Sequence, residues 1–397
     1  MPHPASVHIG AEVVLARIAP GVTLHPGCRI LGEKTSIGPG SELGREQPLT
    51  IENVQLGAGV KLHGGFVSNA TFLDKASMGS GAHVRPGTLL EEEASGAHSV
   101  GLKHTILLPF VTLGSLINFC DCLMAGGTGR RNHGEVGSSY IHFNYTPHQD
   151  KATPSLLGDV PRGVMLDQAP IFLGGQGGLV GPCRIGYGNV VPAGSICRKD
   201  VLDENKIVYC DPPGMGSARI PYDPRVYKDL TRVVINNLIY IGNLRALQQW
   251  YRHVRGPLLP NDPFAQACHE GACRRLSEAV RERILRLRQL AEKVPESIDL
   301  LTGKEDESMA RAIDSQRFFQ ESWPHLEVAL VVEPEDSLGA QDRDHFLAAL
   351  PATLSASPSW PETVAAIPIE VREHGTTWLQ AIVDSVSRLW HPPRALG

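Results

Sequence analysis

A glycine-rich segment between residues 125 and 132 contains Gly127, Gly129, Arg130 and Arg131. Backbone N–H groups between glycines can converge with guanidinium groups on a phosphate, so this composition favours an anion-binding loop. A surface loop without a ligand is the simpler interpretation of the same residues. No G-x-x-x-x-G-K-[ST] run is present, and the glycines at 174–181 lack the G-x-G-x-x-G spacing of dinucleotide sites.

The histidines and cysteines show no spacing typical of a metal site. None of the eight cysteines forms a C-x-x-C pair, and the interval from His142 to His148 is not a recognisable zinc-ligand spacing. Unpaired cysteine is among the residue types most often buried. We therefore expect buried structural thiols and no metal requirement.

A six-residue repeat organises the chain around these residues. Glycine is concentrated in the first half, where 32 of the 41 glycines precede residue 201. Eight hexads begin with an apolar residue and have glycine fourth; they start at Ile18, Leu24, Ile37, Leu56, Met78, Val84, Ile185 and Val191. Such a period indicates a solenoid, with the first position facing the core and the glycine forming a corner. A conventional β-sandwich would place turns every 8–12 residues, which fits less well.

These hexads resemble the left-handed parallel β-helix of hexapeptide-repeat acyltransferases and related sugar-nucleotide enzymes. The resemblance implies three hexads per triangular coil and a homotrimer with sites between neighbouring solenoids. Because stacked coils share one core, the whole repeat region should fold as one unit. We expect a hexapeptide-repeat β-helix domain over residues 1–211.

A closer resemblance covers roughly residues 84–201. The runs Glu135–Tyr145, Leu157–Asp159, Phe172–Pro182 and Val191–Val201 are similar to the acetyltransferase half of bifunctional UDP-N-acetylglucosamine pyrophosphorylase/glucosamine-1-phosphate N-acetyltransferase. The resemblance implies that Arg85 and Lys103 bind substrate phosphate, and both groups suit that task. It also implies a substrate-binding segment containing Asn144, Tyr145 and Lys151. Structural roles at a turn or coil edge are the alternative for these residues.

The chain departs from that family at its catalytic centre. Aligning residues 113–121 with the family motif places Ser115 at the catalytic histidine and Asn118 at a tyrosine. A serine without an activating partner does not accept a proton near neutral pH, so another base is needed. The candidates are His104, His133, His142 and His148, and we favour His142 and His148 because they flank residues 144–145. The segment around 125–132 is a second departure, an insertion of about six residues.

The second half of the chain has the periodicity of helices. A Pro/Gly cluster follows Cys210, and apolar residues then recur at three- and four-residue steps from Val226 to Val254 and from Leu276 to Val294. We expect a helical domain over 212–325 and a small mixed or helical segment over 326–397, with a strand at 327–332 and helices near 345–350 and 376–390. The charged run at 274–288 alternates in sign, which predicts a solvated helix face.

Composition limits the partners. The net charge of −5 gives no electrostatic footprint for nucleic acid or an anionic membrane, and no apolar run is long enough to span a bilayer. The amino terminus lacks the pattern of a secretory signal, so we expect a cytoplasmic protein.

Three functions remain open. The leading hypothesis is a transferase acting on a sugar phosphate or nucleotide sugar, with acyl-CoA (acetyl-CoA) as co-substrate. The loss of the family histidine favours instead a catalytically inactive trimeric sugar-nucleotide-binding or scaffold protein. The glycine-rich loop suggests a sugar-phosphate nucleotidyltransferase. Whether the chain is an enzyme is therefore uncertain from its sequence.

Overall fold

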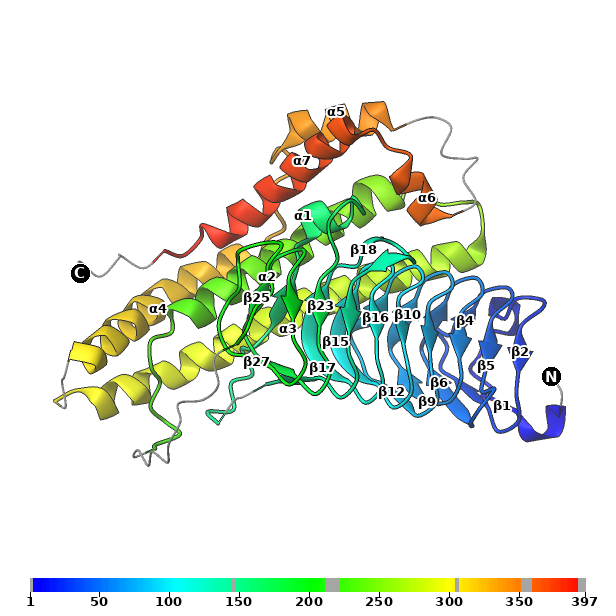
Figure 1. Ribbon diagram of the computed structural model, residues 1–397, viewed down its shortest axis with the longest axis horizontal. Helices are drawn as coiled ribbons and strands as arrows, with labels where there is room; N and C mark the ends of the chain where they lie inside the picture. Colours follow the sequence, from blue (N-terminus) through cyan, green and yellow to red (C-terminus); the bar gives the residue numbers. More distant parts are fainter. Residues whose placement is uncertain (1–2, 145–146, 211–221, 304–306, 351–358, 392–397) are drawn as a thin grey trace.

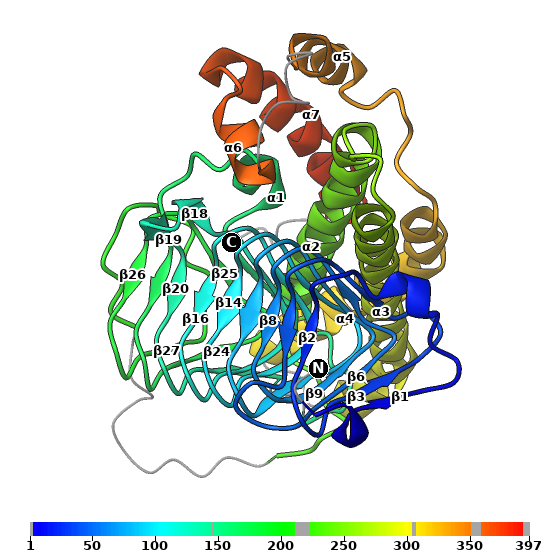
Figure 2. The ribbon, with the colours of Figure 1, turned by 90° about the vertical axis from the view of Figure 1, so that its right-hand side faces the viewer.

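The computed structural model describes residues 3–144, 147–210, 222–303, 307–350 and 359–391. Its N-terminal half is a parallel β-solenoid whose chain visits three faces in a fixed order, one short strand on each face per coil (Figures 1 and 2). Helices follow and lie along one side of the solenoid (Figure 1). The predicted hexapeptide-repeat β-helix with a mainly helical C-terminal region is confirmed.

We name the faces by the order of their strands along one coil. The first face carries β1 (His8–Ile9), β3 (Arg29–Leu31), β6 (Leu49–Glu52), β9 (Gly65–Ser68), β12 (Ala82–Val84), the first halves of β15 (Gly101–Leu107) and β17 (Asn118–Met124), β21 (Ile141–Phe143), β24 (Gly178–Val180) and β27 (Ile196–Cys197). The second face carries β4 (Ser36–Ile37), β7 (Gln55–Leu56), β10 (Ala70–Phe72), β13 (Thr88–Leu90), the second halves of β15 and β17, β22 (Ser155–Leu157) and β25 (Arg184–Ile185).

The third face is a separate nine-stranded sheet. It comprises β2 (Thr23–Leu24), β5 (Glu42–Leu43), β8 (Lys61–Leu62), β11 (Ser77–Met78), β14 (Ser95–Gly96), β16 (Thr112–Leu113), β20 (Glu135–Val136), β23 (Phe172–Leu173) and β26 (Val190–Val191). All pairings within the three faces are parallel, as expected when successive coils stack in the same direction.

The hexad positions have the environments that the repeat predicts. Seven of the eight leading apolar residues are at most 2% exposed, and Ile18 is partly buried against them. The eight glycines at the fourth position all have φ between 67° and 82°. A side chain is strained in that region of backbone conformation, so glycine recurs there because each corner requires it.

Two insertions interrupt the coils. Glu135 pairs with Thr112, 23 residues earlier, whereas Thr112 pairs with Ser95 after only 17 residues. The excess of about six residues forms the antiparallel hairpin β18 (Gly127–Gly129) and β19 (Asn132–His133). The next third-face step, from Glu135 to Phe172, contains the second insertion and the short helix α1 (Val160–Gly163). Two 3-10 turns, η1 (Pro4–Ser6) and η2 (Leu15–Arg17), lie near the amino terminus.

The helical half consists of α2 (Thr231–Trp250), which continues as the π-helical turn η3 (Tyr251–Arg255), α3 (Pro263–Leu301), α4 (Glu307–Val331), α5 (Ala340–Ala349), α6 (Trp360–Ala365) and α7 (Ile369–Ser387). The helices expected near 345–350 and 376–390 are present. The first long helix begins at Thr231 rather than near Val226, and the second begins at Pro263, where the carboxylate of Asp262 accepts a hydrogen bond from the Ala265 backbone amide. With this N-cap the helix begins 13 residues before Leu276, where the predicted periodicity starts.

The strand expected at 327–332 was wrong, because 327–331 lies in α4. The buried residues Trp323, Leu326 and Leu330 recur at helical spacing, whereas Val328 and Val331 are exposed. Packing of α4 on α3 therefore overrides the local β-propensity of the valines. The expected domain boundary at 325/326 falls inside the same helix.

Helices α2 and α3 cover the second face. Helix α3 contacts β4, β7, β10 and β13, helix α2 contacts β22, and α7 packs on the other side of α2 (Figure 1). The prediction that the charged run at 274–288 forms a solvated helix face was wrong for Arg275 and Arg283, because each is only 1% exposed. The guanidinium of Arg275 donates to the carbonyl oxygen of Asn69, and that of Arg283 to Asp121. The helical half is thus attached to the solenoid partly through buried charge.

Candidate active site

Two basic residues lie on adjacent coils at the end of the first-face strands. Leu102 pairs with Val84, which places Lys103 beside Arg85, and Lys103 pairs in turn with Cys120. A guanidinium nitrogen of Arg85 lies 3.3 Å from Cys120 Sγ. Burial raises the pKa of Cys120 although both cations oppose that shift, so its sulfur stays protonated near neutral pH. The structure therefore brings Arg85 and Lys103 together, and their binding of phosphate remains a prediction.

Asn144 lies on the following coil at the same corner. Its amide nitrogen donates to Asp121 Oδ2 at 3.0 Å, and Arg283 of α3 donates to Asp121 Oδ1 at 2.6 Å. Arg283 also donates to the carbonyl oxygen of Lys151 at 3.4 Å, while the Lys151 side chain is exposed. Arg283 therefore connects the Lys151 backbone to Asp121, the carboxylate that also accepts from Asn144. Tyr145 lies outside the described residues.

Of the two histidines favoured from the sequence, His142 lies inside the coil beside this corner, where it interacts with Asp121 and Asn144, and His148 lies elsewhere. His142 is 4% exposed inside the coil, with Nε2 2.7 Å from Ser155 Oγ. Burial lowers the pKa of His142 to about 4, so it is neutral at pH 7. His148 lies against the segment leading to α2, where Nδ1 donates to the Pro224 carbonyl oxygen at 2.5 Å and the ring packs at a tilt against that of Tyr227. A catalytic role for either residue remains a prediction.

A histidine absent from our sequence candidates contacts Ser115. Nδ1 of His98 lies 2.7 Å from Ser115 Oγ, at the corner where the third face turns into the first. The His98 carbonyl oxygen accepts from the Leu116 amide, and Ser138 Oγ accepts from the Ser115 amide, so the backbone fixes this corner. Both side chains reach the surface. Residues one coil apart are neighbours, and the 17-residue interval from His98 to Ser115 is the sequence signal that could have identified the pair.

The other two candidate histidines occupy different places. His104 lies under α3 with Nε2 3.9 Å from Glu282 Oε1, and burial lowers its pKa. It borders a groove of about 340 Å³ whose other walls are Asn69, Pro86 and the α3 residues Glu278, Arg281, Glu282 and Leu285. His133 belongs to the hairpin, and its Nδ1 lies 2.9 Å from the Arg130 carbonyl oxygen.

The glycine-rich loop occupies another corner of the solenoid. Gly127 and Gly129 belong to the hairpin strand β18. The guanidinium of Arg130 donates to the Glu93 carbonyl oxygen at 2.5 Å and to Thr112 Oγ1 at 2.6 Å, where the second face turns into the third. Arg131 is exposed. The structure therefore does not bring this loop together with Arg85 and Lys103, and Arg130 already holds the loop to the coils.

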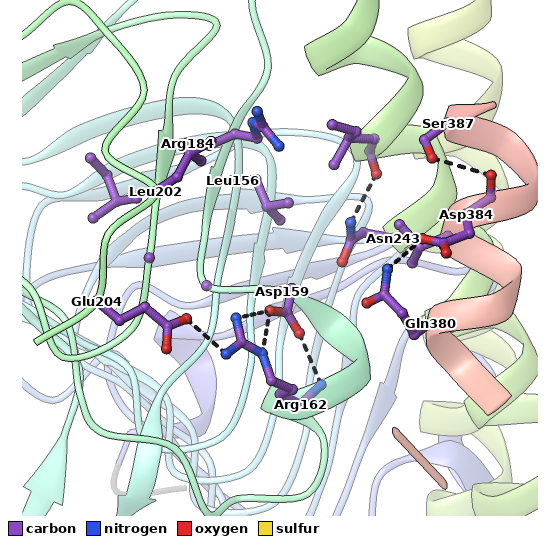
Figure 3. Close-up of a pocket in the computed structure, with 15 residues that line it drawn as sticks. Leu156, Asp159, Arg162, Arg184, Leu202, Glu204, Asn243, Gln380, Asp384 and Ser387 are labelled. Carbon is purple, nitrogen blue, oxygen red and sulfur yellow. Dashed lines mark hydrogen bonds and ion pairs between the residues drawn. The ribbon is translucent and has the colours of Figure 1, made fainter. Parts of the chain in front are cut away.

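A separate cavity of about 250 Å³ lies between the last coils and the helices α2 and α7 (Figure 3). One of its two arginines, Arg162, is paired with Asp159 at 2.6 Å and with Glu204 at 2.7 Å (Figure 3). Both carboxylates would compete with an incoming anion for this guanidinium. The cavity is therefore a weaker candidate for phosphate binding than the corner at Arg85.

In the part of the chain that the structure describes, no three His, Cys, Asp or Glu side chains gather as the ligands of a metal ion would. None of the described helices combines the length and apolar character needed to cross a bilayer.

Comparison with known proteins supports the resemblance seen in the repeat. No protein-family model matches the chain. It is similar to the bifunctional protein GlmU of Pelobacter propionicus, with 28% identity over 199 residues (50% of this chain, 38% of the relative), and to that of Thermus thermophilus, with 32% identity over 184 residues (46% of this chain, 35% of the relative). The chain thus spans well under half the length of these curated relatives.

Two solved structures also match. LpxA from Acinetobacter baumannii is 18% identical with a TM-score of 0.16, covering 46% of this chain and 67% of that chain. UDP-N-acetylglucosamine acyltransferase from Campylobacter jejuni is 12% identical with a TM-score of 0.21, covering 75% of this chain and 94% of that chain. TM-scores this low carry no structural argument, so the similarity rests on the sequence matches.

Proposed function

We propose that this protein is a hexapeptide-repeat transferase that acylates a sugar phosphate or nucleotide sugar on the first face, with acetyl-CoA as donor. The observation that carries the proposal is the placement of Arg85 and Lys103 at one edge of this face and of the hydrogen-bonded Ser115 and His98 at the other. Similarity to the GlmU proteins supports the reaction class.

In this proposal, one edge of the first face binds the phosphate and the other edge carries out acyl transfer. Arg85 and Lys103 anchor the phosphate, where a guanidinium fork and an ammonium complement each other. At the other edge, the acceptor's amino or hydroxyl group attacks the thioester carbonyl carbon and the carbon–sulfur bond breaks. Ser115 takes the acceptor's proton as it passes its own to Nδ1 of His98. The protonated His98 then returns a proton through Ser115 to the sulfur of CoA, which leaves as a thiol. His98, from the preceding coil, thereby acts as the general base, because Ser115 alone does not accept a proton near neutral pH.

Binding tests the anchor first. Isothermal titration with glucosamine 1-phosphate, UDP-N-acetylglucosamine and acetyl-CoA should detect at least one sugar ligand. Each of Arg85→Ala and Lys103→Ala should weaken its binding about 10- to 100-fold, the usual effect of losing a hydrogen bond to a charged group. Lys61→Ala is the matched control, because Lys61 is exposed on the third face. Equal losses in all three variants, or no binding of any ligand, would refute the proposal.

Turnover distinguishes the alternatives. Release of CoA thiol in the presence of the sugar ligand supports the transferase. Binding without thiol release would favour the inactive binding protein, for which the replacement of the family histidine by Ser115 is the motivation. Pyrophosphate release from a sugar phosphate and a nucleoside triphosphate would favour the nucleotidyltransferase.

Assembly as a homotrimer belongs to the same proposal. Light scattering coupled to size-exclusion chromatography should give about three times the chain mass of 42.9 kDa. A monomeric mass would contradict the trimer, and the Arg85 and Lys103 titrations would then show whether one chain alone binds the sugar.

A further inference from the structure

Two cysteines meet at the last coil of the solenoid. Cys197 ends β27, and Cys210 follows 13 residues later. Their Sγ atoms are 2.6 Å apart, so the two thiols contact each other directly. A disulfide between them would need only a small movement of the two side chains.

Backbone pairing on both sides produces the contact. Cys197 pairs with Leu179 of β24, which fixes it on the first face. The segment before Cys210 is held by a parallel bridge between Ile207 and Val190 and by a hydrogen bond from the Val208 amide to the Val190 carbonyl oxygen. The two sulfurs are therefore brought together by the folding of the last coil rather than by a chance side-chain orientation.

We propose that Cys197 and Cys210 form a disulfide that closes the last coil, made by exchange with a small-molecule disulfide such as oxidised glutathione. This inference is independent of the transferase proposal. A third cysteine in this region, Cys183, has its sulfur directed to the Lys199 carbonyl oxygen at 3.1 Å. Cys197, rather than Cys183, is therefore the cysteine that contacts Cys210.

The exchange has two steps. Cys210 is partly exposed, whereas Cys197 is 1% exposed and burial raises its pKa, so the oxidant meets Cys210 first. The Cys210 thiolate attacks one glutathione sulfur and releases the other as a thiol, which leaves a mixed disulfide. Cys197 then loses its proton and attacks Cys210 Sγ, and the second glutathione leaves as a thiol. Two protein thiols and one small disulfide become one protein disulfide and two glutathione thiols.

The test is mass spectrometry of the full chain after equilibration in mixtures of oxidised and reduced glutathione and alkylation of the remaining thiols. Trypsin cleaves after Arg198 and Lys206, so the two cysteines lie on separate peptides. Without reduction, the peptides should appear linked with the loss of two hydrogens, and alkylation of both cysteines should fall together as oxidised glutathione increases.

Variants distinguish this disulfide from general thiol oxidation. Cys210→Ser should abolish the linked peptide, and because this side chain is partly exposed the variant should fold. Cys273→Ser is the matched control, since Cys273 is also partly exposed but lies beside His269 in α3. Oxidised parent should melt at a higher temperature than reduced parent, and Cys210→Ser should show no such difference. Full alkylation of both cysteines at every glutathione ratio, or a stable glutathione adduct on Cys210, would overturn the inference.

Discussion

The first and second faces are made from the same coils, yet their polar residues have different surroundings. On the first face, Arg85 and Lys103 are partly exposed, and Ser115 and His98 reach the surface at its edge. On the side covered by helices, Glu91 and Asp121 are buried and paired with residues of η3 and α3. A stack of coils offers its faces to different partners, so the face on which a charged residue lies indicates whether it holds the fold or meets a ligand.

The largest expected effect of a substitution is on the covered side. Asp121→Asn, whose side chain tolerates the positive φ of 61° at this position, leaves the buried guanidinium of Arg283 without its carboxylate, which should lower the free energy of unfolding by about 3–5 kcal/mol. Chemical denaturation measures this loss. The double variant Asp121→Asn/Arg283→Met, which removes both charges, should recover much of the stability. A fully stable single variant would mean that the helices do not depend on this pair.

The second effect depends on pH. Burial raises the pKa of Glu91 to about 7, whereas in the unfolded chain it stays near 4.5. The folded protein therefore holds this proton more tightly, so stability falls as pH rises from about 4.5 to 7, by about 3 kcal/mol in total. Glu91→Gln should remove that fall because glutamine does not titrate. Its amide oxygen can still accept the hydrogen bond from the Tyr251 hydroxyl. The variant should thus be more stable than the parent at pH 8.

The neighbouring residue is the control for that substitution. Glu92 pairs with the largely buried Arg255 through both carboxylate oxygens, so Glu92→Gln should destabilise the protein at pH 8. Thermal denaturation across pH 4–8 measures both variants. Parallel pH profiles for the parent and Glu91→Gln would contradict the role given to Glu91.

The smallest expected effect concerns the glycine-rich loop. Arg130→Ala removes hydrogen bonds to Glu93 and Thr112 at the surface, which should cost about 1 kcal/mol of stability or less. Affinity for the sugar ligand should stay within about twofold of the parent, because this loop lies at a different corner from Arg85. Isothermal titration measures it, and a loss of affinity equal to that of Arg85→Ala would move the phosphate site to the loop.

The repeat could be predicted from the sequence because its signal is local. An apolar residue and a glycine three positions later report directly on burial and on positive φ, as at Leu24 and Gly27. The family resemblance predicted that Arg85 and Lys103 act together. Predicting the contact of His98 with Ser115 would have required the number of residues in that coil, which varies along the chain.

The helical half was harder to predict because its contacts are distant in sequence. Arg283 alternates with acidic neighbours as a solvated residue would, and only its contact with Asp121, 162 residues earlier, shows that it is buried. Val328 and Val331 favour a strand locally, but packing against α3 keeps this segment helical. In both cases the partner lies on another element, and no local pattern records it.

The most direct test of acyl transfer on the first face is the rate of acetyl-CoA-dependent thiol release by His98→Gln, measured together with its affinity for the sugar ligand. Loss of a general base should lower the rate about 10²- to 10⁴-fold, with Ser115→Ala falling in parallel and ligand affinity unchanged. His142→Gln, on the buried histidine, is the comparison and should retain a measurable rate if it folds. A parental rate in His98→Gln, with the rate lost only in His142→Gln, would contradict the account.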